Sequence, residues 1–243
     1  KIRSVLSLFK EVFPEAETAR YKAAFSDLMA PTGRLRDLDV YLLERETYFA
    51  LLPESLHAGL AEMFGQFQME RDGAQRKLAR RFRSKAYAAE IADIEALFAG
   101  DDLPRGPRAD LPAHDYASAL IWKRYRKVCK IARAIDANTP EDEVHELRIS
   151  CKKLRYLIEF FAPLFSNDDL AKVLKPLKKL QDNLGLFNDY SVQQDALRTF
   201  VETHKSRNRA NDMEVAMAAG GLITVLHERQ RVERARVAKR FNH

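Results

Sequence analysis

His145–Phe165 reads HELRISCKKLRYLIEFFAPLF, and its apolar residues recur at alternating intervals of four and three. This spacing predicts an amphipathic helix that buries one side in a core. The apolar residues are Leu147, Cys151, Leu154, Ile158 and Phe161. Thr139 and Pro140 precede three acidic residues at 141–143. Such a sequence favours a helix start, because the helix dipole stabilises negative charge in the first turn.

Four potential cations share a different side of this predicted helix. At about 100° per residue, they fall within about 80° of one another. They are His145, Arg148, Lys152 and Arg155, and they are called the basic stripe below. Lys and Arg usually lie in water, so a basic stripe by itself indicates a solvated surface and no particular ligand.

The stripe also belongs to a longer motif, His-x-x-Arg-x-x-x-Lys-Lys-x-Arg-Tyr-x-x-Glu-x-Phe, which starts at His145. This motif resembles the signature of the CHAD domain family, whose members bind inorganic polyphosphate. The resemblance implies an all-α fold of two helical-bundle halves, with about four helices each, related by a pseudo-two-fold axis. It further implies a central basic cavity that holds the polyphosphate.

An internal repeat agrees with this resemblance. A constant offset without a gap aligns residues 1–40 with residues 153–192. The matched pairs include Lys1 with Lys153, Arg3 with Arg155, Phe9 with Phe161, Gly33 with Gly185 and Asp37 with Asp189. A constant offset over this length indicates two copies of one helical unit. We therefore predict a first half at residues 1–103 and a second half at 104–243, divided in a Gly-rich and Pro-rich linker.

The repeat leaves three residues of the second copy without a counterpart. The partners of His145, Arg148 and Lys152 would precede Lys1, and the chain does not begin with Met. We expect the chain to begin inside the leading helix of the first copy, with a second His/Arg/Lys block upstream in the natural protein.

Basic residues are dense in other predicted helices as well. The other predicted helices cover residues 1–13, 15–29, 54–98, 114–136, 167–184, 188–205 and 213–241, and the basic residues are dense in those at 54–98, 114–136, 167–184 and 213–241. The basic end of the last one matches the end of the first copy, although a frayed tail is the alternative. The predicted polyphosphate-binding residues are Arg3, Arg76, Arg80, Arg83, Lys85, His145, Arg148, Lys152, Lys153, Arg155, Lys175, Lys178, Lys179, Arg234 and Lys239.

Composition narrows the classes of function. A net charge of +6 and a pI near 9.3 favour an anionic partner. Nucleic acid is the main alternative to polyphosphate, but the sequence has no helix-turn-helix, zinc-finger or RNP-like motif. A phosphoanhydride hydrolase, or a domain accessory to one, is a weaker alternative because a phosphate-cradling GxxxxGK[ST] loop is missing.

We therefore expect a polyphosphate-binding module that is not an enzyme and needs no cofactor or metal. Two cysteines without zinc-type spacing indicate reduced thiols and a cytoplasmic location, which association with polyphosphate granules would suit. We expect no membrane partner, since apolar runs of about 20 residues are absent. Sequence makes no prediction of the oligomeric state.

Overall fold

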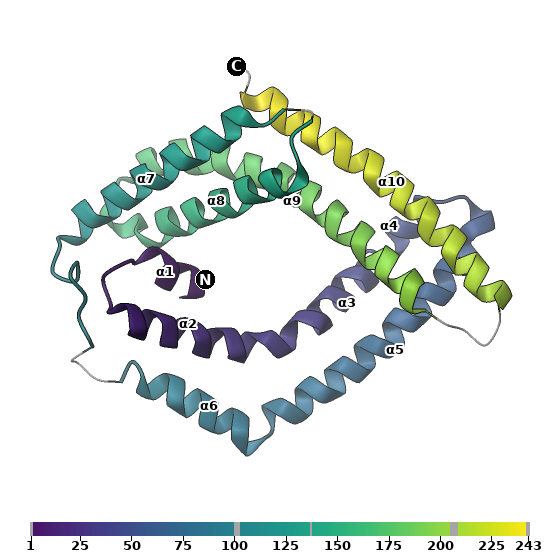
Figure 1. Ribbon diagram of the computed structural model, residues 1–243, viewed down its shortest axis with the longest axis horizontal. Coiled ribbons are helices and arrows are strands. Elements are labelled where there is room, and N and C mark those ends of the chain that lie inside the picture. The colour runs from purple at the N-terminus through teal and green to yellow at the C-terminus, as the bar shows by residue number, and fades with distance from the viewer. Residues whose placement is uncertain (1, 100–102, 137, 205–208, 242–243) are drawn as a thin grey trace. The chain divides into compact units, whose positions relative to one another are not determined.

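The computed structural model describes residues 2–99, 103–136, 138–204 and 209–241 (Figure 1). Within these ranges the chain is helical and has no strand, so the all-α prediction is confirmed. The α-helices are α1 (Ile2–Leu8), α2 (Glu15–Met29), α3 (Gly33–Leu43), α4 (Arg45–Ala50), α5 (His57–Phe82), α6 (Lys85–Ala96), α7 (Ala113–Ala134), α8 (Glu141–Phe160), α9 (Asn167–Thr203) and α10 (Arg209–Phe241). Short 3-10 helices cover Ala30–Thr32, Glu54–Leu56 and Ala162–Leu164.

The helices form two compact units that are interleaved along the chain. The first unit comprises Lys1–Ser26, Gly100–Asp189 and Gln230–His243, and the second comprises Asp27–Ala99 and Tyr190–Arg229. Helices α9 and α10 each contribute residues to both units. The predicted boundary between residues 103 and 104 follows the sequence repeat instead. That boundary, the pseudo-two-fold axis and the central cavity stay predictions.

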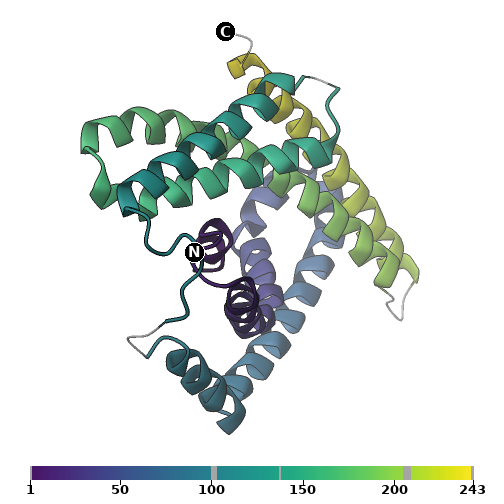
Figure 2. The ribbon, with the colours of Figure 1, turned by 60° about the vertical axis from the view of Figure 1, so that its left-hand side comes forward.

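In the first unit, α8 is the central element of the core. It lies beside α7 (Figures 1 and 2). Its apolar stripe is buried as the spacing predicts, from Leu147 at 0% exposure to Phe161 at 6%. Residues from α7, α9 and α10 complete this core, including Val128, Leu184 and Val237. Burying one side of α8 in this way leaves its charged side at the surface of the unit.

A smaller apolar cluster attaches α1 to α7 and α8. Leu8 is buried against Tyr116 and Leu157, and the Tyr116 hydroxyl donates a hydrogen bond of 2.9 Å to the carbonyl of Lys10. Helix α1 ends at Leu8, five residues before the end of the helix that was predicted over residues 1–13. Beyond it, Glu11 adopts a left-handed backbone with φ of 67°.

Hydrogen bonds from the linker before α7 explain the left-handed backbone of Glu11. The backbone N–H of Arg108 donates to the Glu11 carbonyl at 2.9 Å, and the N–H of Gly106 donates to the Val12 carbonyl at 2.8 Å. A Cβ at Gly106 would stand 2.3 Å from the Glu11 carbonyl oxygen, so only glycine allows this close approach. The contact holds the linker against the segment that follows α1.

The core of the second unit is rich in aromatic residues. Tyr41, Phe64 and Phe67 are buried together with residues of α9 and α10. Helices α5 and α10 approach closely at Gly59, where a Cβ would lie 2.2 Å from the carbonyl oxygen of Glu214. A missing side chain thus sets the spacing of the two helices.

Proline positions explain where α2 and α8 begin and end. Helix α2 covers the predicted residues 15–29, after Pro14 and before the 3-10 turn that contains Pro31. Helix α8 begins at Glu141, directly after Pro140. It ends at Phe160 rather than at Phe165, because Pro163 occupies a 3-10 turn there.

Two further predicted boundaries, near Ser84 and Gly185, are also wrong. The single helix over residues 54–98 is two helices, because Ser84 is extended and its Oγ accepts a hydrogen bond of 3.1 Å from the N–H of Tyr87. This side chain caps the start of α6. Conversely, the predicted break near Gly185 does not exist, and α9 runs through it. Leu184 and Phe187 are both buried in the first unit's core, so an unbroken helix fits that packing.

Candidate anion-binding surfaces

Polar side chains fix the start of the helix that carries the basic stripe. The Asp136 carboxylate accepts hydrogen bonds from the N–H of Asn138 at 2.8 Å and from the Thr139 hydroxyl at 3.1 Å. These bonds lower the pKa of Asp136. The Thr139 oxygen in turn accepts from the N–H of Asp136 at 2.7 Å. These hydrogen bonds fix the turn that precedes α8 and so define where the helix starts.

The structure places the basic stripe on one edge of α8, and its first member contacts α9. His145 is exposed, and its Nδ1 donates to the side-chain oxygen of Asn188 at 2.7 Å. This bond leaves Nε2 as the ring nitrogen for a ligand. Sequence reasoning gave Asn188 no role, because its contact with His145 depends on the packing of α9 against α8.

Arg148 is the least compensated member of the stripe. It is half-buried, yet within the described residues its guanidinium forms no hydrogen bond or ion pair. None of its nitrogens is buried without a hydrogen-bond partner, so water solvates its N–H donors in the empty protein. An anion bound beside Arg148 would replace that water.

Tyr156 supports the other two cations of the stripe. The Lys152 Nζ lies 5.8 Å from the centre of its ring, and the Arg155 guanidinium lies 5.6 Å from it. Arg155 also pairs with Glu159, with 3.4 Å between Nε and Oε1. The ring can stabilise the positive charge of both side chains, although the Arg155 Nε is itself buried.

A second group of cations lies on the other edge of α8, around half-buried Lys153. Burial lowers the pKa of Lys153, and three neighbouring cations lower it further. These are Arg124, Lys127 and Lys22, in order of decreasing effect. Together with Lys153 they are called the Lys153 cluster. The nearby Glu146 opposes the shift, but it already pairs with Lys127 at 2.8 Å.

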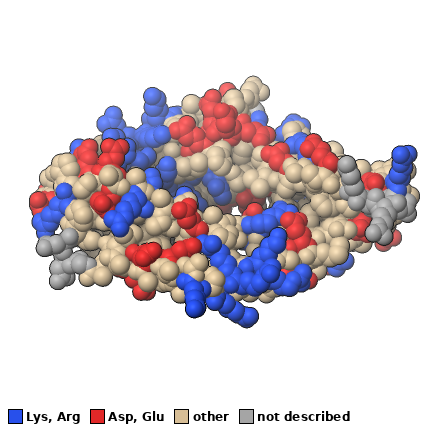
Figure 3. Space-filling view, turned by 60° about the horizontal axis from the view of Figure 1, so that its bottom comes forward, with Lys and Arg blue, Asp and Glu red and all other residues tan. Residues whose placement is uncertain are grey.

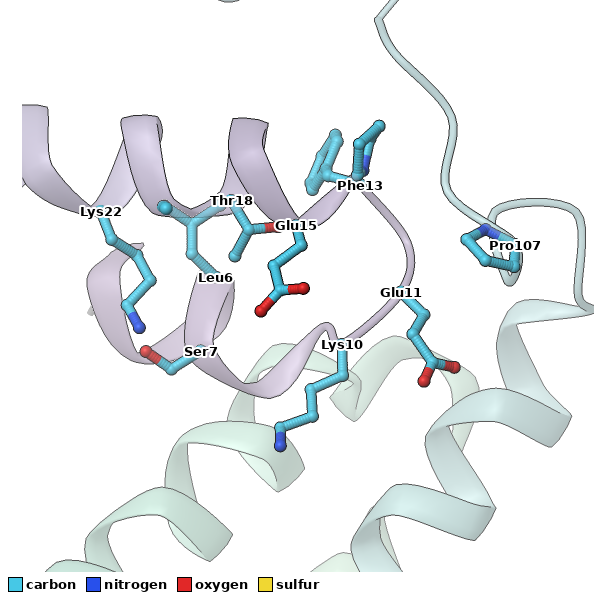
Figure 4. A pocket seen from close by; sticks show the side chains of 11 residues that line it. Leu6, Ser7, Lys10, Glu11, Phe13, Glu15, Thr18, Lys22 and Pro107 are labelled. Atoms are coloured by element: carbon cyan, nitrogen blue, oxygen red, sulfur yellow. The ribbon is translucent and has the colours of Figure 1, made fainter.

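The sequence predicted Lys153 as a site residue but not its neighbours. Lys22 lies in α2 and Arg124 in α7, far from residue 153 in the chain. Lys22 also lines a hollow of about 570 Å³ between α1 and α2. Figure 4 shows its side chain extending toward Ser7, while the Glu15 carboxylate points into the space between the helices.

The basic end of α10 is anchored in the first unit. Arg234 lies 5.3 Å over the ring of Phe187, and its guanidinium is 3.7 Å from the Glu141 carboxylate. The buried Glu233 carboxylate accepts a hydrogen bond of 2.8 Å from Asn183. This segment is thus a packed helix rather than a frayed tail. Lys239 belongs to the same helix, and its side chain lies outside the described residues.

The remaining predicted residues of the first unit are exposed. Arg3 lies on α1, and Lys175, Lys178 and Lys179 lie on α9. Lys179 differs from its neighbours, because it lines an apolar groove. Within the described residues, Arg3, Lys175 and Lys178 form no hydrogen bond or ion pair with the basic stripe.

In the second unit, the predicted residues gather where α5 ends and α6 begins. Arg76, Arg80, Arg83 and Lys85 are all exposed, and within the described chain none of them forms an ion pair. Arg83 caps the end of α5 with a helical backbone, and its N–H donates to the carbonyl of Ala79, so it continues the helix that carries Arg76 and Arg80. Figure 3 shows Lys and Arg side chains gathered in distinct groups on the face drawn there.

Other cations of the second unit are paired instead. Arg34 binds the Glu70 carboxylate at 2.7 Å, Arg71 binds Asp39 at 2.8 Å, and Arg81 binds Glu90 at 2.7 Å. Among the described residues, no group of three His, Cys, Asp or Glu side chains could hold a metal ion. In the same part of the chain, every helix is too short or too polar to cross a bilayer.

The fold and these surfaces define an all-α protein with basic, partly desolvated helix edges. The chain belongs to the CHAD domain family, whose family model matches residues 1–198. No curated protein matches the chain. The family resemblance expected from the motif at His145 is thereby confirmed.

Proposed function

We propose that this protein binds inorganic polyphosphate on the two cationic edges of α8 and carries out no chemistry on it. The observation that supports this most is Arg148, a half-buried arginine whose guanidinium has no acceptor among the described residues and is open to a ligand. It stands between His145 and Lys152 on the basic stripe. A chain of phosphates would satisfy several of these donors at once.

Polyphosphate suits this arrangement for a chemical reason. Its charge is repeated along the chain and it has no bases to be read, so Lys point charges and forked Arg donors suffice for recognition. The described part of α8 offers no row of exposed aromatic rings on which bases could stack. Membership of the CHAD domain family also implies this ligand. Nucleic acid shares the phosphates, so it is the necessary comparison.

The direct test is calorimetric titration with long-chain polyphosphate, single-stranded DNA and duplex DNA, each at low and high salt. We expect polyphosphate to bind more tightly than either nucleic acid at both salt concentrations. Nucleic-acid binding should weaken steeply with salt, because it depends on the release of counterions. Equal affinity for all three polymers would reduce the protein to a nonspecific polycation binder and would contradict the proposal.

A charge-reversal variant of the basic stripe tests whether polyphosphate binds there. The variant Arg148→Glu/Arg155→Glu should bind polyphosphate at least about 100-fold more weakly, since each charge-assisted hydrogen bond contributes about 1.5–3 kcal/mol. The matched control is Lys123→Glu/Arg126→Glu, which makes the same charge change at exposed positions of α7. Similar losses in both variants would show that only net charge matters.

Two further measurements complete the test. Circular dichroism must show that both double variants remain helical, and the milder Arg148→Gln supplies a reading if charge reversal prevents folding. Orthophosphate release is measured during long incubation with polyphosphate. A release rate above that of the polymer alone would contradict the proposal that the protein performs no chemistry.

A further inference from the structure

A groove of about 490 Å³ opens beside α7, α8 and α9 in the first unit. Its lining residues are Tyr125, Val128, Cys129, Leu154, Lys172, Val173, Pro176, Leu177, Lys179 and Leu180. The volume falls in the range of small-molecule sites, about 300–1,000 Å³. The lining combines an apolar floor with two lysines, and it includes no carboxylate among the described residues.

Large apolar side chains at the groove are in contact with water. Tyr125 is 42% exposed and Val173 is 38% exposed. Trp122, 59% exposed, stacks on Tyr125 with 5.8 Å between ring centres and 20° between planes. Contiguous exposed apolar surface is unfavourable and often marks a binding site. A ligand with an apolar body would remove this surface from water.

The charges indicate the head group of such a ligand. Lys172 and Lys179 both line the groove. Lys172 pairs with Asp169 at 3.0 Å, but both side chains are more than 70% exposed. An exposed ion pair of this kind contributes little, so an incoming anion can compete for the ammonium. Charge complementarity therefore favours an anionic head.

We propose that this groove binds a free monocarboxylate amphiphile of the fatty-acid class. The alkyl chain lies along Val173, Pro176 and Leu177, and the carboxylate lies near Lys172 at one end of the groove. The proposal is independent of polyphosphate binding, since the basic stripe and the Lys153 cluster do not line the groove.

The test is titration with octanoate, decanoate and dodecanoate below their micelle concentrations. Trp122 is the single tryptophan of the chain, so its fluorescence reports on the rim of the groove directly. Each methylene that enters the groove should tighten binding about four-fold, from about 0.8 kcal/mol per buried CH₂. Dodecanol, which lacks the charge, should bind more weakly than dodecanoate. A constant affinity along the series would overturn the proposal.

A pair of variants on one helix supplies the control. Val173→Glu places a carboxylate in the groove and should weaken dodecanoate binding at least about ten-fold by charge repulsion. Val192→Glu makes the same change on α9 at an exposed position outside the groove lining, and it should leave the affinity unchanged. Both positions are exposed, so both variants should fold. Equal weakening by the two variants would refute the location.

Thiol reactivity gives an independent reading. Half-buried Cys129 lines the groove, whereas Cys151 is fully buried and burial raises its pKa to about 12. Saturating dodecanoate should slow the alkylation of Cys129. Unchanged alkylation would contradict the proposal.

Two other occupants have distinct signatures, and each would overturn the proposal. Binding to phosphatidylglycerol vesicles without binding of monomeric dodecanoate would assign the groove to a membrane surface. A blue shift of Trp122 emission with rising protein concentration alone, together with dimers in analytical ultracentrifugation, would assign it to a second copy of the chain.

Discussion

Replacement of Lys153 with methionine should stabilise the fold and at the same time weaken the binding of polyphosphate. Methionine keeps the apolar stem that α8 half-buries and removes the charge. Burial and three neighbouring cations lower the pKa of Lys153, so the charged form is less favourable in the folded protein than in the unfolded chain. At neutral pH the wild-type fold therefore carries a free-energy cost that the variant lacks.

The size of this effect follows from the neighbours of Lys153. Three cations act against one carboxylate, which leaves two like charges uncompensated. At about 0.2–0.5 kcal/mol for each exposed like-charge pair, removing the ammonium should stabilise the fold by about 0.4–1 kcal/mol. For a chain of this size, this corresponds to a rise in Tm of about 1–4 °C.

The dependence on pH has a definite sign. The folded-state pKa of Lys153 lies below the ordinary value of 10.5. Between these two values the unfolded chain binds more protons, so wild-type stability rises with pH. The advantage of Lys153→Met should therefore be complete at neutral pH and vanish above about pH 10.5. Salt should also reduce it, because the charges are partly exposed.

The assay is thermal unfolding followed by circular dichroism, with and without polyphosphate. Lys123→Met is the matched control, since Lys123 is an exposed lysine on α7 and its loss should change stability by less than about 0.5 kcal/mol. Polyphosphate should raise the Tm of the wild type more than that of Lys153→Met. A lower Tm for Lys153→Met without polyphosphate would contradict the predicted charge repulsion, and an equal rise with polyphosphate would remove Lys153 from the binding site.

Two stability predictions concern the second unit, and urea denaturation tests both. Gly59→Ala should destabilise by about 1–3 kcal/mol, because its Cβ would lie 2.2 Å from the Glu214 carbonyl oxygen. Gly65→Ala on the same helix has open space and should stabilise by about 0.5–1 kcal/mol, so changes of the same sign would contradict the packing argument. Ser84→Ala should cost about 1 kcal/mol by removing the cap that binds the N–H of Tyr87. Ser84→Asp should retain most of that stability, and a full loss would argue against capping.

Local signals account for the helices that the sequence predicted well. Pro14 and Pro31 bracket α2, and Pro140 with the acidic residues after it starts α8. Proline restricts the backbone of its own residue and of the preceding one, so it acts without help from tertiary structure. Helix ends at these positions can therefore be read from the chain alone.

The missed boundaries depend on competing interactions. Ser84 interrupts a stretch whose apolar spacing continues on both sides, and the spacing gave no hint that the capping bond would form. Gly185 has the opposite outcome, because buried Leu184 and Phe187 favour a continuous α9. A glycine permits a turn but does not impose one.

The candidate site likewise has one part that the sequence predicted and another part that only the structure shows. Helical periodicity alone placed His145, Arg148, Lys152 and Arg155 on one edge of α8. The partner of His145 is Asn188, and two neighbours of Lys153 come from α2 and α7. Such contacts join distant parts of the chain, so no spacing rule could have predicted them.

The pairing of cations separates structural from binding surfaces in this protein. On the second unit, Arg34, Arg71 and Arg81 each meet a carboxylate within 2.8 Å, which is how a fold compensates partly buried charge. On α8 the compensation is incomplete, since Arg148 has no described partner and Lys153 has a lowered pKa. A fold selected only for stability would replace these residues, as the expected gain from Lys153→Met illustrates. Their presence is explained if an anion supplies the missing charge, because the same uncompensated cations that weaken the empty protein strengthen its complex.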